Sequence, residues 1–233
     1  MSIHLARDLE KLKKDLLTMG AMVEEAIYES VTALRERRPE VARDVIEGDD
    51  RIDQWEIEVE EECLKILALH QPVAKDLRFI ASVMKINNDL ERMGDLAVNV
   101  AERAEFLATV APIPVPRLLS QMAEAAMRMV RESLDAFVNC DSEAARRICK
   151  EDDEVDRYNR EVIGEIQEMM ERHPETIPRA SHLFSVSRQL ERIADHATNI
   201  AEDVVYMVEG EIIRHATSID ENAPSKLGTG GQP

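Results

Sequence analysis

Acidic side chains recur at helical spacing in two stretches of the sequence, LERMGDLAVNVAE at residues 90–102 and LERIADHATNIAE at residues 190–202. Residues three or four positions apart lie along one face of a helix, so each stretch would present these side chains together. They are Glu91, Asp95, Asn99 and Glu102 in the first stretch and Glu191, Asp195, Asn199 and Glu202 in the second. Like charges at this spacing cost roughly a few tenths of a kcal/mol per pair, so we expect something to compensate the repulsion.

Two pairs of aspartates at the same spacing precede these stretches. They are Asp49 and Asp53 in the first half of the chain and Asp152 and Asp156 in the second. If an antiparallel helical hairpin turns at Pro72, the aspartate pair and the Glu91/Asp95 pair are equally far from the turn. In the second half the same construction places the turn at His173 and Pro174. The sequence therefore predicts two clusters of four carboxylates, each at one level of a hairpin.

Four carboxylates within a few ångströms repel one another strongly, and a bound cation is the simplest compensation. Oxygen-rich sites suit Mg, Mn or Fe, with Zn also possible. Two metal sites are thus predicted, held by Asp49, Asp53, Glu91, Asp95 and Asn99 and by Asp152, Asp156, Glu191, Asp195 and Asn199. The alternatives are raised carboxyl pKa values, a nearby arginine, or a solvated helix face without metal. His196 is either a further ligand or a helix-surface residue.

The motifs of common enzyme classes are missing from the sequence. None of the six histidines follows a glutamate at the spacing that ferritin-like di-metal oxidases use. There is no Gly-rich phosphate loop, no Ser or Cys nucleophile motif and no cysteine-based zinc pattern. We therefore expect a protein that is not an enzyme. A metal-dependent hydrolase or oxidase that uses the two clusters is one alternative, and a metal-free helical module that binds partners is another.

Long amphipathic helices are expected to position the clusters. Aromatic residues make up only 3% of the chain and Gly and Pro are few, which favours an all-α fold. Apolar residues recur every seven positions at Val45, Ile52, Val59 and Ile66, and again at Ile148, Val155, Val162 and Met169. This spacing is typical of the seam of a long antiparallel bundle. Helices are expected to end before Pro39, Pro72 and Pro174, because proline disfavours helical conformation in the residue before it.

The sequence also contains an internal duplication, since VARDVIEGDD at residues 41–50 aligns with AARRICKEDD at residues 144–153. It predicts two tandem three-helix bundles, at residues 1–110 and 117–215. Three alternating prolines at residues 111–116 exclude helix and favour a stiff connector. Residues 216–233 lose the apolar period and gain Gly, Pro and Ser, which predicts a disordered tail.

The charge and composition limit the partners. A net charge of −18 repels nucleic acid and anionic lipid surfaces and suits cations or basic protein surfaces. The charged N-terminal residues do not match a signal peptide, and no stretch approaches the roughly 18 apolar residues of a membrane span. The three cysteines lack metal or redox spacing, so we expect small core residues in a reducing cytoplasm. Exposed apolar residues on the long helices favour a homodimer.

Two segments resemble the PhoU family: QPVAKDLRFIASVMKINNDLERMGD at residues 71–95 and SRQLERIADHATNIAE at residues 187–202. The resemblance covers roughly residues 5–215 and includes the duplicated three-helix plan. The acidic motif of the family falls on Glu91/Asp95 and Glu191/Asp195, which implies iron or zinc binding. Where the family usually has Gly after Glu-Arg-Ile, this sequence has Ala194.

The resemblance to PhoU proteins also implies a function. It implies a cytoplasmic adaptor between the ATPase subunit of a phosphate ABC transporter and a sensor histidine kinase, which represses the phosphate-starvation response. Such an adaptor would meet the membrane only through its partners.

Overall fold

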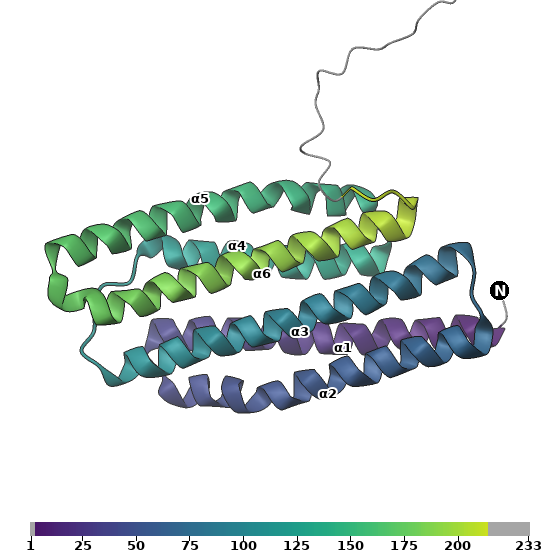
Figure 1. Cartoon of the computed structure of the whole chain (residues 1–233), viewed down its shortest axis with the longest axis horizontal. Coiled ribbons are helices and arrows are strands. Elements are labelled where there is room, and N and C mark those ends of the chain that lie inside the picture. The colour runs from purple at the N-terminus through teal and green to yellow at the C-terminus, as the bar shows by residue number, and fades with distance from the viewer. Residues whose placement is uncertain (1–2, 214–233) are drawn as a thin grey trace, which may run out of the picture.

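The computed structural model describes residues 3–213, and in this range every regular element is a helix (Figure 1). The helices are α1 (Ile3–Glu36), α2 (Pro39–His70), α3 (Ala74–Thr109), α4 (Arg117–Asn139), α5 (Ser142–Arg172) and α6 (Ile177–Glu209), with the short 3-10 helix η1 (Pro174–Thr176) before α6. The all-α class and the arrangement in two tandem three-helix bundles are therefore confirmed. The tail predicted at residues 216–233 lies outside the described residues.

Local chemistry explains where the helices begin and end. Pro39 is in the first turn of α2, where its missing N–H leaves no hydrogen bond unmade. Gln71, with a φ of 45°, closes α2 in the left-handed conformation just before Pro72. The Asp141 side chain caps α5 by accepting a hydrogen bond of 2.9 Å from the Ala144 backbone N–H. The residues with three alternating prolines form no helix between α3 and α4.

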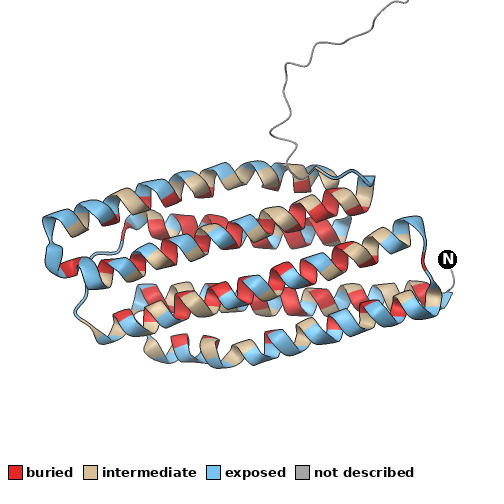
Figure 2. Cartoon of the chain, viewed as in Figure 1, coloured by how far each residue is buried: buried red, intermediate tan, exposed pale blue. Residues whose placement is uncertain are grey.

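Within each half the three helices pack on one another, and the halves meet chiefly where α3 lies beside α6 (Figure 1). Helices α1 and α4 lie behind this pair, while α2 and α5 run along the two outer edges. Figure 2 shows the buried residues concentrated on α3 and α6 and on the inward faces of the other helices. The seam residues Val45, Ile52, Val59, Ile66, Ile148, Val155 and Val162 are buried, and Met169 is half-buried.

The cysteines differ in their surroundings. Cys63 is buried and Cys149 half-buried, and burial raises the pKa of their thiols to about 12 and about 11. Cys140 is exposed, because it closes α4 in the left-handed conformation where the chain leaves the bundle. The expectation that all three cysteines are core residues is therefore wrong for Cys140. No helix within residues 3–213 is long and apolar enough to cross a membrane.

Helices α1 and α4 approach closely at Gly20, where a Cβ atom would lie 2.8 Å from Cδ1 of Leu134. We expect Gly20→Val to lower the free energy of unfolding by about 2 kcal/mol, because the added side chain must displace the buried Leu134 side chain from its packing between α1 and α4. Gly164 in α5 is the control, since a Cβ there would meet nothing within 4 Å. Gly164→Ala should stabilise the protein by about 0.5–1 kcal/mol through helix propensity. Urea unfolding measures both, and equal effects would contradict close packing at Gly20.

Candidate functional site

The two carboxylate clusters are each built from one helical hairpin. The first cluster is Asp49 and Asp53 on α2 with Glu91 and Asp95 on α3, and the second is Asp152 and Asp156 on α5 with Glu191 and Asp195 on α6. The negative charges of Asp53, Asp95 and Glu91 all act on Asp49. Asp152 is likewise influenced by Asp195, Asp156 and Glu191. The structure therefore brings together the carboxylates that the hairpin construction placed at one level.

Burial and mutual repulsion disfavour the charged forms of these side chains. Burial, followed by repulsion from neighbouring carboxylates, raises the pKa of Asp49 from 3.8 to about 6. The same causes raise the pKa of Asp152 to about 6. Burial also raises the pKa values of Glu91, Glu191 and Asp195. Both clusters consequently hold carboxylates whose charged forms are less favourable than they would be in water.

Basic side chains approach these clusters only at their edges. Arg92 lies 3.6 Å from Glu91, and Arg188 donates to Glu191 at 3.0 Å. In the second cluster Arg160 also lies 3.6 Å from Asp156. Within the described part of the chain, neither Asp49 nor Asp152 forms an ion pair with Lys or Arg. An arginine placed among the carboxylates therefore does not account for the two central aspartates.

The two asparagines of the predicted sites contact other groups. The Asn99 side-chain amide donates to the Asp95 backbone carbonyl at 2.7 Å. The Asn199 amide donates to a carboxylate oxygen of Asp89 at 3.3 Å. The same Asp89 oxygen lies 2.8 Å from Nδ1 of His196. His196 and Asn199 on α6 thus hydrogen-bond across the junction of the two halves to α3, in addition to any role near the second cluster.

Asp89 is a buried polar residue that the sequence reading missed. Its side chain is 12% exposed, and it joins α3 to α6 through His196 and Asn199. The sequence distinguishes Asp89 from the cluster residues by its position two residues before Glu91, which turns it toward a different face of the same helix. Gln189 follows the same spacing in the second copy, and its buried side-chain oxygen has no hydrogen-bond partner among residues 3–213.

The donor chemistry of the clusters fits hard or borderline cations, although the carboxylate side chains do not point toward a common centre. Among residues 3–213, no group of three or more His, Cys, Asp or Glu side chains is arranged closely enough to hold a metal ion. The carboxylates repel one another, Asp49 and Asp152 are half-buried, and carboxylate oxygens are the ligands such cations prefer. A Cβ on Gly94 would lie 3.3 Å from a carboxylate oxygen of Asp49, so this helix passes close to the first cluster. Binding would require rotamer changes that draw the carboxylates inward.

The metal-free protein is expected to be more stable at about pH 5 than at about pH 7.5, because native Asp49 and Asp152 retain protons there that the unfolded chain has released. This stabilisation is complete below the unfolded pKa of 3.8 and is lost as the pH rises through about 6. Allowing for solvent screening, we expect a difference of about 1–2 kcal/mol in total. Urea unfolding in the presence of a chelator at both pH values measures it.

The control for this pH dependence is Asp49→Asn/Asp152→Asn, which removes both titrating groups. Burial lowers the pKa of His182, and this group acts in the opposite direction as the pH falls. The difference between wild type and the double variant isolates the contribution of the aspartates. An identical pH dependence in the two proteins would contradict the prediction.

Comparison with known proteins gives consistent matches over both halves. The family model described as "PhoU domain" matches residues 16–104 and 119–204. The chain is 41% identical over 213 residues to a protein of Aquifex aeolicus named "Phosphate-specific transport system accessory protein PhoU homolog", covering 91% of this chain and 96% of that protein. It is 40% identical to the protein of the same name from Pseudomonas aeruginosa, covering 89% of this chain and 86% of the relative.

Two solved structures have the same fold. The crystal structure of PhoU from Pseudomonas aeruginosa has a TM-score of 0.84 at 39% sequence identity, and the match covers 88% of this chain and 99% of that one. The phosphate transport system regulatory protein PhoU from Streptococcus pneumoniae has a TM-score of 0.83 at 31% identity, with 89% of this chain and 98% of the other covered. The similarity therefore includes both three-helix halves.

Proposed function

The chain belongs to the PhoU family, and from this premise we propose that it is a regulatory accessory protein of a phosphate-specific transport system. The observation that carries the proposal is the similarity of almost the whole chain to relatives with that name, at up to 41% identity over 91% of its length. The relatives are named as accessory proteins and not as enzymes, which supports a role without catalysis. We further propose that the protein acts in the cytoplasm and meets the membrane only through its partners.

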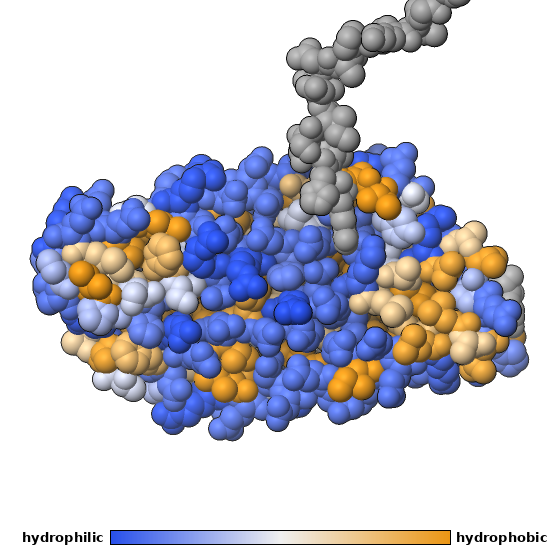
Figure 3. Space-filling model, in the orientation of Figure 1, coloured by the Kyte–Doolittle hydropathy of each residue, from blue (hydrophilic) through white to orange (hydrophobic). Residues whose placement is uncertain are grey.

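The proposed partners are the ATPase subunit of the transporter and a sensor histidine kinase. Long helices provide extended surfaces, and a net charge of −18 complements basic patches on other proteins and accelerates association with them. By connecting the two partners when phosphate is plentiful, the protein would repress the phosphate-starvation response. A homodimer stays a prediction, supported by apolar side chains that gather toward both ends of the face seen in Figure 3.

We also propose that the two carboxylate clusters bind metal ions. Asp49, Asp53, Glu91 and Asp95 would hold one site, and Asp152, Asp156, Glu191 and Asp195 the other. A bound Fe, Zn, Mn or Mg ion would supply a positive charge that offsets the mutual repulsion of these carboxylates. The ion would thereby hold α2 against α3 and α5 against α6. Asn99 and Asn199 hydrogen-bond through their side-chain nitrogens, whereas a metal ion would bind their side-chain oxygens.

Deletion of the gene in its native host, followed by complementation, tests the proposed function. We expect a phosphate-starvation reporter that is silent in phosphate-rich medium to become active after deletion and silent again when the wild-type gene is restored. Binding of the purified protein to the transporter ATPase and to the cytoplasmic part of the kinase, measured separately, tests the adaptor role. An unchanged reporter in the deletion strain would contradict the function, and failure to bind either partner would contradict the adaptor mechanism.

A further inference from the structure

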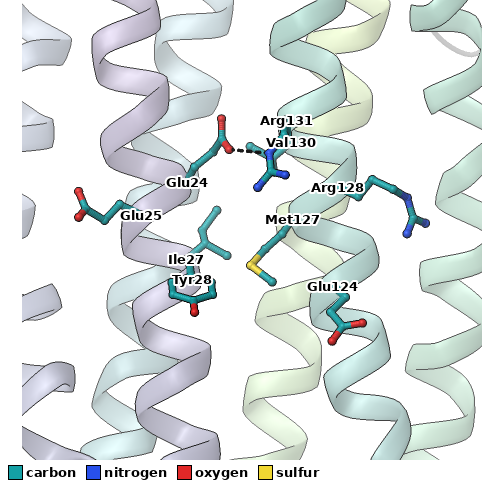
Figure 4. A pocket seen from close by; sticks show the side chains of 9 residues that line it. All are labelled: Glu24, Glu25, Ile27, Tyr28, Glu124, Met127, Arg128, Val130 and Arg131. Atoms are coloured by element: carbon teal, nitrogen blue, oxygen red, sulfur yellow. Dashed lines mark hydrogen bonds and ion pairs between the residues drawn. The ribbon is translucent and has the colours of Figure 1, made fainter.

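A groove lies between α1 and α4, on the side of the molecule behind α3 and α6. The two helices approach closely where Gly20 faces Leu134, and the groove lies farther along α1, beside Ile27 and Tyr28. It has a volume of about 430 Å³ and is bordered by side chains of both helices (Figure 4). A groove of this size holds a few large side chains of a ligand.

The floor and walls of the groove are apolar. Ile27 and Val130 are buried, and Met127 is half-buried against the core. Tyr28, one of only three tyrosines in the protein, is a large aromatic side chain that is 57% exposed. Tyrosine and methionine are enriched at the centres of protein interfaces, and the flexible methionine side chain adapts to the shape of a partner. The groove thus has the composition of a small docking surface.

The arginines of the groove are already paired within the fold. Arg131 donates to Glu24 at 3.3 Å (Figure 4). Arg128 donates to Glu154 at 3.2 Å and lies 3.7 Å from Glu151. An anionic ligand would have to break these pairs and approach a protein with a net charge of −18. Phosphate groups and nucleic acid are therefore disfavoured at this surface.

The charges left over in the groove are negative. Glu25 on α1 and Glu124 on α4 are exposed, and neither forms an ion pair within residues 3–213. Figure 4 shows one on each of the two helices that border the groove. An occupant that carries lysine or arginine on both sides of an apolar stripe would match this arrangement.

We propose that the groove between α1 and α4 binds a basic amphipathic helix of a partner protein, an inference that rests on the proposed accessory function because that function requires a protein partner. Apolar side chains of the helix would pack between Tyr28 and Met127. Its lysine or arginine side chains would pair with Glu25 and Glu124. This is the recognition mode in which an amphipathic helix lays its apolar face into a groove between helices.

A synthetic peptide tests the proposal directly. The probe is a fluorescein-labelled peptide of about 18 residues, with leucine at helical spacing on one face and lysine on the other. Its affinity for the purified full chain is measured by fluorescence anisotropy at about 0.15 M salt. We expect Glu25→Lys/Glu124→Lys to weaken binding by about tenfold or more, because both acidic partners are replaced by repelling charges.

The matched control is Glu165→Lys/Glu171→Lys on α5, which makes the same change in net charge. Both glutamates are exposed, and neither forms an ion pair within the described residues. We expect this variant to change the affinity by less than about twofold at this salt concentration, because distant surface charges are screened. Equal weakening in the two lysine variants would overturn the proposal, because binding would then depend only on overall charge.

A second variant tests the apolar part of the groove. Tyr28→Ala/Met127→Ala should weaken peptide binding by about tenfold, because it removes both adaptable apolar side chains. Thermal melting monitors whether the variant remains folded. Unchanged affinity would overturn the proposal. Sedimentation provides a further check, because conversion of a wild-type dimer to a monomer by this variant would assign the groove to a second copy of the chain and overturn the proposal too.

These measurements separate the groove from the proposed function. Peptide binding requires only the purified protein, whereas phosphate regulation is tested by deletion and complementation in the host. If the peptide does not bind but the complemented strain has an intact phosphate response, only the proposal that the groove binds a helix is overturned. An unaltered reporter in the deletion strain overturns the accessory function and with it the reason to expect a protein partner.

Discussion

Asp49→Asn/Asp152→Asn is expected to raise the melting temperature of the metal-free protein and to abolish the stabilisation that added metal provides. Neutral pH is above the pKa of about 6 of both aspartates, so each carries a charge that burial and the neighbouring carboxylates disfavour. Asparagine has nearly the same shape and no charge. After allowance for solvent screening we expect about 1 kcal/mol per site, or about 2–4 °C in melting temperature for each.

Metal should stabilise the wild-type protein much more than the double variant. A ligand that binds only the native state stabilises it by about 2.7 kcal/mol when its free concentration is about 100 times the dissociation constant. Two sites would therefore give the wild-type protein about 5 kcal/mol, whereas the double variant would gain little. Thermal melts with Mn, Zn and ferrous iron, each compared with a chelator, measure the difference. Elemental analysis of protein purified without a histidine tag gives the number of bound ions.

Asp50→Asn/Asp153→Asn is the matched control for this experiment. It also removes two negative charges, but at the neighbouring positions, whose side chains are exposed. We expect this control to keep the metal-dependent increase in melting temperature. If wild type, variant and control all respond to metal alike, or if no metal exceeds background in the elemental analysis, the proposed metal sites are wrong. The stabilisation of the metal-free variant would then still report the repulsion between carboxylates.

Lys85→Met is expected to lower the free energy of unfolding by about 3 kcal/mol, because it removes one member of an ion pair whose carboxylate, on Asp203, is buried. The Lys85 ammonium on α3 lies 3.0 Å from the Asp203 carboxylate on α6, whose side chain is only 2% exposed. The same ammonium lies 5.1 Å from the centre of the Tyr206 ring. The loss corresponds to a melting temperature lower by about 6–12 °C, since about 1 kcal/mol shifts a protein of this size by 2–4 °C.

A double-mutant cycle separates the lost pair from the loss of the lysine side chain. Adding Asp203→Leu to Lys85→Met removes the buried carboxylate as well, so we expect the double variant to recover to within about 1 kcal/mol of wild type. Lys75→Met is the control, because Lys75 is exposed and has no ion pair within residues 3–213. It should change stability by no more than about 0.5 kcal/mol. Equal effects of Lys85→Met and Lys75→Met would show that the pair between the halves contributes nothing.

The helices and their hairpins could be predicted because the determinants are local. Prolines at positions 39, 72 and 174 mark the helix boundaries, and the residues that recur every seven positions are the ones that become buried. An antiparallel hairpin also fixes which residues lie side by side, since both of its helices start from the same turn. For this reason Asp49 could be placed beside Glu91 and Asp95 from the sequence.

The contacts between the two halves could not be predicted in this way. Asp89 with His196 and Asn199, and Lys85 with Asp203, join α3 to α6 over more than a hundred positions of sequence. No turn links these helices directly, so the faces that meet depend on how the two bundles pack. Cys140 was misjudged for a related reason, because its exposure depends on where the chain leaves α4.

The amino-acid sequence by itself determined the all-helical class, the internal duplication, the family and the pairing of acidic residues within each hairpin. The family is indicated by the resemblance of residues 71–95 and 187–202, and the other properties follow from residue spacing along single helices, across short turns and between the two copies. The tertiary structure alone decided the partners of Asn99, Asn199 and His196, the degree of burial that raises the carboxyl pKa values, and the groove between α1 and α4. Each of these depends on the distance between helices that are not joined by a turn, or on side-chain rotamers, and neither is encoded in periodicity.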